Sequence, residues 1–219
     1  SGVNPSDVKA RAGVRNKTLP FPLIVPHSDG AGVIDQVGSG VDPARIGERV
    51  WVWNAAWARP MGTAAQYVAL PAQQAVTLPD AIDFSVGACL GIPALTAYHA
   101  VALDGGVTGK SVLVTGGAGA VGHYAIQFAK LGGAKRVIAT VSSDAKGAIA
   151  IEAGANAFVT TLVIQPDRKI VFGGGFTVYD GEPRLRIARI HGGTMSGPGT
   201  FEFTRGLFTV GENATNVLI

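Results

Sequence analysis

SVLVTGGAGAVGHYAIQFAKL, residues 111–131, is the stretch that decides the fold of this chain. It opens with an apolar run from Val112 to Val114, short and β-branched enough to form a buried parallel strand. A glycine-rich turn follows. Apolar residues then recur at helical spacing from Val121 to Ala129, as in a helix that packs on a sheet. The stretch therefore predicts a strand, a turn and a helix, which together begin a βαβ unit.

The turn contains the pattern G-x-G-x-x-G at Gly117, Gly119 and Gly122, between the strand and the helix that make this pattern meaningful. We expect Gly117 to allow the tight turn, Gly119 to let the backbone approach a pyrophosphate, and Gly122 to let the helix pack closely on the strand. The N-terminus of the helix offers free N–H groups and a partial positive charge to phosphates. The alternative is a glycine-rich turn without a ligand. We interpret the pattern as a nicotinamide dinucleotide site.

The amino-acid composition limits the class of protein and the partners that this chain can have. The chain has 219 residues, 47% hydrophobic and 15% charged, which predicts a soluble, core-forming protein of one large or two small domains. The net charge of +3 is small and unclustered, so no nucleic acid partner is expected. No apolar segment is long enough for a membrane span, and no signal peptide is visible. A single cysteine, Cys89, rules out an intramolecular disulfide and fits a cytoplasmic protein.

Alanine usage changes sharply along the chain. Residues 1–160 contain thirty alanines, whereas residues 161–219 contain two. Beyond Thr160, short alternating apolar segments separated by Gly, Pro, Asp and Asn are typical of β-structure. We therefore expect a boundary near residue 160.

Upstream of the glycine turn, the sequence predicts a series of short strands with helices at either end. The expected helices cover residues 4–13, 83–89 and 94–103, and the expected strands cover residues 33–37, 50–53, 62–70 and 76–78.

Several of these segments together resemble a known family. SGVNPSDVKARAG, SDGAGVIDQVGSGV, IGERVWVW, GIPALTAYHAV and the glycine turn with its following strand, in this order, are similar to the medium-chain dehydrogenase/reductase superfamily. Within it they look most like the zinc-independent NADPH:quinone oxidoreductases of the zeta-crystallin-like branch. The resemblance covers about residues 1–158. It implies an α/β fold: a partial GroES-like β-barrel domain (1–90, incomplete at its N-terminus), then a truncated Rossmann βαβ unit (91–160), with a cofactor between them.

The resemblance also implies an activity and particular site residues. The activity is hydride transfer from NADPH to a small quinone, enone or other conjugated carbonyl. Asn4 matches an asparagine near the nicotinamide, and Thr96 matches a threonine that contacts the cofactor. Gly119, Ala120, Val121 and Gly122 match the pyrophosphate turn. For Asn4 the alternative is an ordinary helix cap, and for Thr96 it is a hydroxyl bonded to its own helix.

The cofactor can also be argued from the end of the second strand. An NAD enzyme usually has an acid there, about twenty residues after the glycines, to bind the ribose 2′-hydroxyl. Here Ser142 follows the strand and no acid occupies its end. Lys146 resembles a lysine that several family members direct at the 2′-phosphate, and the alternative is a solvated surface lysine. We therefore expect NADPH.

Metal chemistry is not expected. Zinc-dependent members of the superfamily have a cysteine near Val3 or Asn4 and a cysteine-rich lobe, which this sequence lacks. The four histidines show no zinc-binding spacing. His27 stands where the resembled family usually has glycine. Catalysis would then consist of placing a quinone over the nicotinamide, with a proton from solvent.

The tail, residues 161–219, resembles different proteins. Residues 162–193 are similar to one delta-60 repeat, and residues 199–219 are similar to the opening strands of a Calx-β domain. We therefore expect a chimeric chain whose truncated Rossmann sheet has an uncovered edge strand and whose enzyme activity is impaired. The alternatives are a non-catalytic fragment that still binds cofactor, and a surface β-repeat module. A homodimer would be one way to cover the exposed edge.

Overall fold

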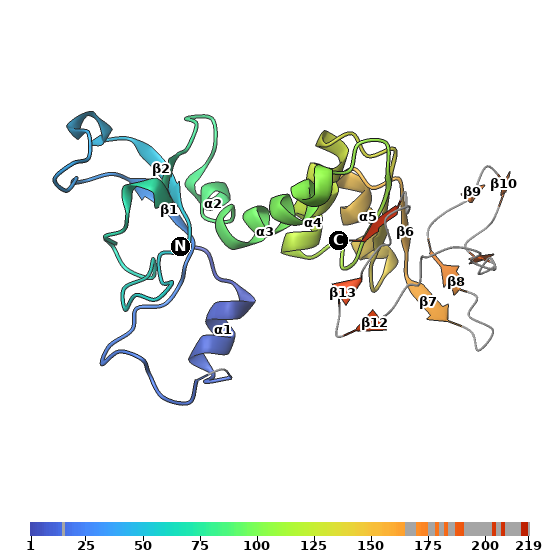
Figure 1. Ribbon diagram of the computed structural model, residues 1–219, viewed down its shortest axis with the longest axis horizontal. Coiled ribbons are helices and arrows are strands. Elements are labelled where there is room, and N and C mark those ends of the chain that lie inside the picture. The colour runs from blue at the N-terminus through green and yellow to red at the C-terminus, as the bar shows by residue number, and fades with distance from the viewer. Residues whose placement is uncertain are drawn as a thin grey trace. The chain divides into compact units, whose positions relative to one another are not determined.

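The computed structural model of the protein describes residues 1–14, 16–164 and 170–174, and the short strands at 178–179, 182–183, 187–190, 203–204, 207–208 and 216–218. The chain divides into two compact units, Ser1–Leu95 and Thr96–Ile219 (Figure 1). Helix α3 (Gly91–Ala102) begins in the first unit and ends in the second. The expected domain limits at residues 90 and 160 stay predictions.

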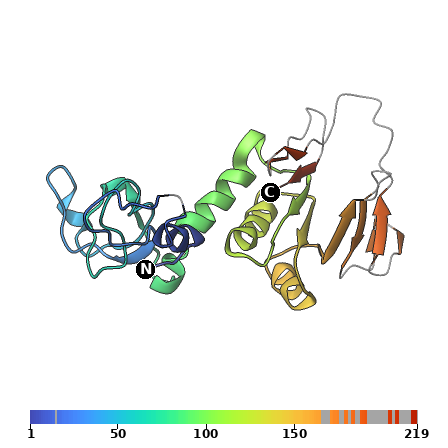
Figure 2. The same cartoon turned by 90° about the horizontal axis from the view of Figure 1, so that it is seen from below.

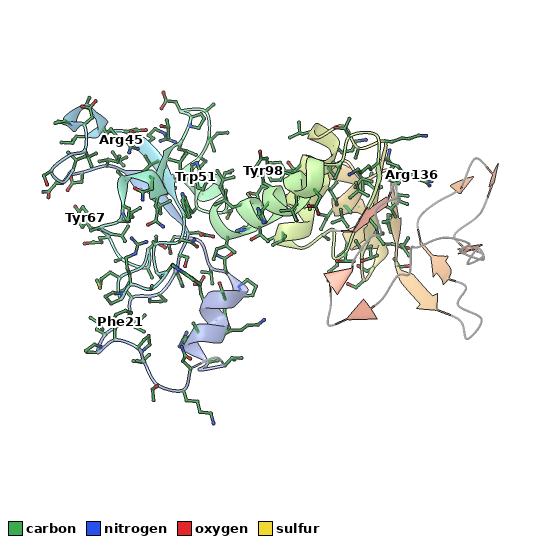
Figure 3. The ribbon with its side chains drawn as sticks, viewed as in Figure 1. Phe21, Arg45, Trp51, Tyr67, Tyr98 and Arg136 are labelled. Atoms are coloured by element: carbon green, nitrogen blue, oxygen red, sulfur yellow. The ribbon has the colours of Figure 1, made fainter. Side chains whose placement is uncertain are left out.

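The first unit is built on a small antiparallel sheet with the strand order β1-β2-β3. Trp51, labelled in Figure 3, lies on the middle strand, opposite Ala31 on one side and Val76 on the other. Helix α2 packs on β1 and β2. The elements of this unit are α1 (Pro5–Arg11), β1 (Gly30–Val33), 3-10 helix η1 (Pro43–Arg45), β2 (Arg49–Val52), η2 (Ala72–Gln74), β3 (Ala75–Thr77) and α2 (Phe84–Gly87).

Two strand predictions in this unit are wrong. The strand expected at 33–37 instead ends at Val33, as β1. The strand expected at 62–70 does not form, because residues 62–64 donate main-chain hydrogen bonds of 2.8–3.1 Å to the carbonyl groups of residues 25–27. The hydroxyl group of Thr63 also donates a hydrogen bond of 2.6 Å to the carbonyl oxygen of Asp29. Residues 62–64 thus bond to the preceding loop rather than to a strand of the sheet.

The second unit contains the predicted βαβαβ unit. Strands β4 (Ser111–Val114), β5 (Arg136–Thr140) and β6 (Ala157–Val159) pair in parallel in this order. Helices α4 (Ala120–Leu131) and α5 (Asp144–Glu152) connect them, contact the strands and contact each other, so both cover the same face of the sheet (Figure 2). The α/β class expected from the sequence is confirmed. A short 3-10 helix, η3 (Leu103–Gly105), follows α3.

The core of the second unit lies between this sheet and these helices. Burial alternates along β4 and β5, so every second side chain points into the core. Alanines on α4 and α5 let the helices approach the strands closely. Tyr98 on α3 (Figure 3) packs edge-on against Phe128 on α4, with ring centroids 5.6 Å apart. The fully buried core residues include Val112, Val114, Ala125, Ile126, Ala129, Val137, Ala139 and Ala150.

The tail forms further strands, and one of them joins the parallel sheet. Strand β14 (Asn216–Leu218) pairs in parallel with β4, with Val217 opposite Val112, giving the sheet order β14-β4-β5-β6. Strand β4 is therefore paired on both sides, on one of them by a segment about a hundred residues away in sequence, while β6 lies at an end of the strand order. The uncovered edge strand expected from the sequence stays a prediction. The other tail strands are β7 (Thr161–Ile164), β8 (Ile170–Gly173), β9 (Val178–Tyr179), β10 (Glu182–Pro183), β11 (Ile187–Ile190), β12 (Phe203–Thr204) and β13 (Leu207–Phe208).

Candidate functional site

The turn between β4 and α4 is shaped by a glycine that the motif does not include. Gly116 has a φ of +67°, the left-handed conformation that glycine adopts without steric cost. Its carbonyl oxygen accepts a 2.8 Å hydrogen bond from the N–H of Gly119, which closes the turn. Gly117, to which the sequence assigns the tight turn, is the second residue of this turn, and the left-handed residue is the preceding Gly116.

Gly117 and Gly122 allow close packing around the turn, because neither position has room for a Cβ. Gly117 is buried, and a Cβ there would lie 2.6 Å from the Cβ of Ala139 on the neighbouring strand β5. At Gly122 a Cβ would overlap the carbonyl oxygen of Gly116 and approach the Cα of Gly117 to 2.9 Å. The first turn of α4 therefore rests directly on the backbone of the turn.

The outer side of the same turn is open. Gly119, Ala120 and Val121 are exposed, and the nearest atom to a Cβ built on Gly119 is the carbonyl oxygen of Gly116, at 3.2 Å. Gly119 caps a helix of twelve residues. The N–H groups in the first turn of such a helix have no acceptor within the helix, and they carry a partial positive charge. This face can therefore hold an anion such as a pyrophosphate.

Thr140, the last residue of β5, fixes the turn from the side. Its hydroxyl oxygen accepts a 3.1 Å hydrogen bond from the N–H of Gly116, and its carbonyl oxygen accepts one of 3.0 Å from the N–H of Gly117. Sequence reasoning did not single out Thr140. Its position at the end of the second parallel strand was the available signal, because the carboxyl ends of neighbouring parallel strands meet at one edge.

Two residues predicted to select the cofactor lie together at that edge. The Nζ of Lys146 donates a 2.9 Å hydrogen bond to the Oγ of Ser142. Ser143 caps α5, because its Oγ accepts a 3.3 Å bond from the N–H of Lys146. Both Ser142 and Lys146 are exposed. A cation and a hydroxyl group thus stand side by side just beyond the end of β5.

The other two predicted site residues lie in different units. Asn4 belongs to the first unit, is 7% exposed, and begins α1, where its main-chain N–H donates to the carboxylate of Asp7 at 2.7 Å. Its side-chain amide donates a 2.7 Å hydrogen bond to Asp29. Thr96 belongs to the second unit and is exposed on α3. The helix-cap alternative for Asn4 is thus correct as a description of its backbone, while its amide has a buried partner.

In the part of the chain that the structure describes, no helix is long and apolar enough to cross a membrane. Within the same residues, no cluster of three His, Cys, Asp or Glu side chains could hold a metal ion. Zinc independence stays a prediction.

Known families match both parts of this architecture. Residues 1–80 match the alcohol dehydrogenase GroES-like domain, and residues 120–179 match the family described as zinc-binding dehydrogenase. These two matches support the resemblance to the medium-chain dehydrogenase/reductase superfamily. The GroES-like and Rossmann-type domains that the sequence predicts are confirmed.

Individual members of the superfamily give the extent of the likeness. A quinone oxidoreductase of Pongo abelii is 36% identical over 158 residues, which are 71% of this chain and 46% of that protein. A 2-methylene-furan-3-one reductase of Solanum lycopersicum is 38% identical over 149 residues, which are 65% of this chain and 38% of that protein. A solved mycobacterial structure, complexed with NADPH, is 32% identical with a TM-score of 0.61, over 72% of this chain and 47% of that one. The chain thus spans less than half the length of these relatives.

Proposed function

We propose that this chain binds NADPH at the glycine turn after β4, as part of a zinc-independent oxidoreductase that reduces quinones or enones. The likeness to a quinone oxidoreductase and to a furanone reductase supports the class of carbonyl substrate. The likeness to a protein complexed with NADPH supports the cofactor.

The observation that carries the proposal is the pair formed by Ser142 and Lys146. Their hydrogen bond of 2.9 Å holds an ammonium group beside the end of β5. A carboxylate at this place binds the ribose 2′-hydroxyl of NAD, whereas a cation accommodates the 2′-phosphate of NADP. A lysine fixed there by a serine therefore favours NADPH.

Each part of the cofactor has a candidate binding group. The exposed N–H groups of Ala120 and Val121 would bind the pyrophosphate, and Ser142 with Lys146 would bind the 2′-phosphate. By resemblance to the family, Asn4 would lie near the nicotinamide and Thr96 would contact the cofactor. When bound, the reduced nicotinamide supplies a hydride for the conjugated carbonyl. The protein would contribute by binding, orienting and shielding the two reactants.

The proposal extends to the chain as a whole. The chain spans less than half the length of the relatives compared. The impaired turnover expected from the sequence remains part of this proposal. The likeness of the tail to a delta-60 repeat and a Calx-β domain, and hence a chimeric origin, remains part of this proposal, as does a homodimer. Much of the tail sequence lies outside the described residues.

Dissociation constants for NADPH and NADH test the cofactor, measured by fluorescence titration on the full chain and on Lys146→Ala. We expect NADPH to bind more tightly, and Lys146→Ala to weaken NADPH binding about tenfold, the effect of one charge-assisted hydrogen bond. Lys135→Ala is the matched control, since it removes an exposed lysine next to the opposite end of β5. Equal affinities that the Lys146 substitution leaves unchanged would refute the NADPH assignment.

A turnover assay separates the enzyme from its alternatives. NADPH oxidation is followed with 1,4-benzoquinone as acceptor, on the same samples used for titration. Turnover above the rate without protein supports the oxidoreductase. Cofactor binding without turnover identifies a non-catalytic fragment, and neither binding nor turnover leaves the surface β-repeat module.

A further inference from the structure

The side chain of Asp29 joins three separate segments of the first unit. Asp29 is 1% exposed and immediately precedes β1. Its Oδ2 accepts a 2.7 Å hydrogen bond from the amide nitrogen of Asn4 at the start of α1. The same oxygen accepts a 2.8 Å bond from the N–H of Ile92, in the first turn of α3. A buried carboxyl group therefore ties α1 and α3 to the sheet.

The backbone around Asp29 is built to admit this carboxyl group. A Cβ on Gly91 would overlap its Oδ1 atom, so the side chain lies directly against the Cα of Gly91. The carbonyl oxygen of Asp29 accepts hydrogen bonds from the N–H of Gly2 at 2.8 Å and from Thr63 at 2.6 Å. Both the main chain and the side chain of Asp29 are thus fixed.

This arrangement determines how the amide of Asn4 is turned. An amide donates only from its nitrogen and accepts only at its oxygen, while Asp29 Oδ2 acts as the acceptor. The NH2 group of Asn4 must therefore face Asp29. One of its two hydrogens is used in this bond, which leaves the other as a donor.

We propose that Asp29 is a positioning residue, which fixes the side-chain amide of Asn4 so that its second N–H can bind the carbonyl oxygen of a ligand. The inference rests on the proposed function, in which Asn4 contacts the nicotinamide half and a conjugated carbonyl is reduced. A fixed donor of this kind stabilises the negative charge that develops on a carbonyl oxygen as it receives hydride.

Asp29 is an unusual residue to serve a purely structural purpose. Its Oδ1 atom is buried and has no hydrogen-bond partner among the described residues. Burial raises the pKa of this carboxyl group, because the loss of hydration outweighs the hydrogen bonds from Ile92 and Asn4, and the nearby Asp7 carboxylate adds to the rise. A buried polar atom without a partner destabilises the fold, which is consistent with a position retained for the site.

Side-chain amide signals test the positioning directly. In the ¹H–¹⁵N spectrum of the full chain, the NH2 signals of Asn4 are assigned by their loss in Asn4→Asp. In Asp29→Asn the new amide oxygen can still accept from Asn4, but the acceptor loses its negative charge and the hydrogen bond weakens, so we expect the Asn4 signals to shift. The control is Asp35→Asn, which removes an exposed carboxylate two residues after β1 and should leave those signals in place. Unchanged Asn4 signals in folded Asp29→Asn would overturn the proposal.

Steady-state kinetics on the same variants test whether the fixed amide of Asn4 affects hydride transfer. With benzoquinone, Asp29→Asn should lower kcat at least tenfold, while the dissociation constant for NADPH stays within twofold, because the phosphate turn lies in the other unit. Asn4→Ala removes the amide itself, so it should lower kcat at least as much as Asp29→Asn does. An Asn4→Ala variant with the kcat of the unaltered chain would contradict the proposal.

Different results would refute the proposed function and the positioning role of Asp29. If the unaltered chain neither binds NADPH nor oxidises it, the proposed function fails, and the Asn4 signals alone then decide whether Asp29 sets the amide. If the chain turns over NADPH and Asp29→Asn does so equally fast, the positioning role is refuted while the function stands.

Discussion

The first turn of α4 sits on the backbone of Gly116, so closely that a Cβ on Gly122 would overlap the carbonyl oxygen of Gly116. A Cβ built on Gly119, three residues earlier, would lie 3.2 Å from that same oxygen and would meet no other atom within 4 Å. Two glycines of one motif thus have separate purposes. Gly122 is needed for the fold, and Gly119 leaves room for a ligand.

Substitutions at these two glycines should therefore affect different properties, stability at Gly122 and cofactor binding at Gly119. Gly122→Ala should lower the free energy of unfolding by about 1–3 kcal/mol, the usual cost of overpacking. Gly119→Val should keep the fold, because its φ of −81° and ψ of 164° suit a β-branched residue, yet abolish NADPH binding by filling the space for the pyrophosphate. Circular dichroism, urea unfolding and NADPH titration measure the three quantities.

Gly32→Ala on β1 is the control for the general effect of replacing a glycine, because a Cβ added there meets nothing within 4 Å. It should change neither stability nor binding appreciably. If Gly119→Val still binds NADPH with an unaltered circular dichroism spectrum, the phosphate site lies elsewhere in the chain.

Cofactor preference should reverse when an acid is placed at the end of β5. In Ser142→Asp the carboxylate would pair with Lys146 and repel the 2′-phosphate, while offering an acceptor to the 2′-hydroxyl of NADH. We expect NADPH affinity to fall at least tenfold and NADH affinity to rise. Ser143→Asp adds the same charge one residue on and keeps a good helix cap, so it should alter the preference less. Identical ratios in the two variants would count against this placement of the ribose.

His27 should be replaceable by glycine with a gain in stability. Its φ is +77°, a left-handed backbone that costs a residue with a Cβ about 1–2 kcal/mol. Part of this gain is lost to the greater chain entropy of glycine, so His27→Gly should raise the free energy of unfolding by about 0.5–1 kcal/mol. His27→Ala retains the Cβ and should give no gain. Equal stability of the two variants would show that the backbone conformation is not strained.

Removal of residues 216–219 should destabilise the second unit. It would leave β4 without the parallel partner that β14 provides and expose its main-chain groups at a sheet edge. We expect a lower midpoint of thermal unfolding and concentration-dependent self-association, seen by light scattering against the full chain at matched concentration. A shortened chain that melts at the same temperature and stays monomeric would mean that β14 adds no stability.

The buried carboxyl group of Asp29 should make stability depend on pH. Its pKa is raised in the folded protein by burial, so between the unfolded and folded pKa values the folded state binds more protons. The contribution is therefore fully present below the unfolded pKa and is lost as pH rises through the folded pKa. The free energy of unfolding of the unaltered chain minus that of Asp29→Asn should fall over this window. A difference that is flat from acidic to neutral pH would contradict the raised pKa.

Local pattern was sufficient to predict the βαβαβ unit that begins at β4. The run Val112–Val114, the glycines and the helical spacing up to Ala129 each act over a few residues, where backbone sterics and periodicity decide the structure. Ser142 and Lys146 are also close in sequence, four residues apart, and they meet because Ser142 lies two residues after β5 while Lys146 lies in the first turn of α5.

Contacts between distant residues could be seen only in the tertiary structure. The bond from Asn4 to Asp29 spans 25 residues, that from Gly116 to Thr140 spans 24, and β14 pairs with a strand about a hundred residues before it. Nothing local distinguishes Asp29 from an exposed acid in a turn, because its burial comes from α1 and α3 closing over it. Likewise, residues 62–70 were predicted as a strand, but residues 62–64 bond to the segment at 25–27. Periodicity specifies which faces of a segment are apolar, whereas long-range packing selects the partner that covers them.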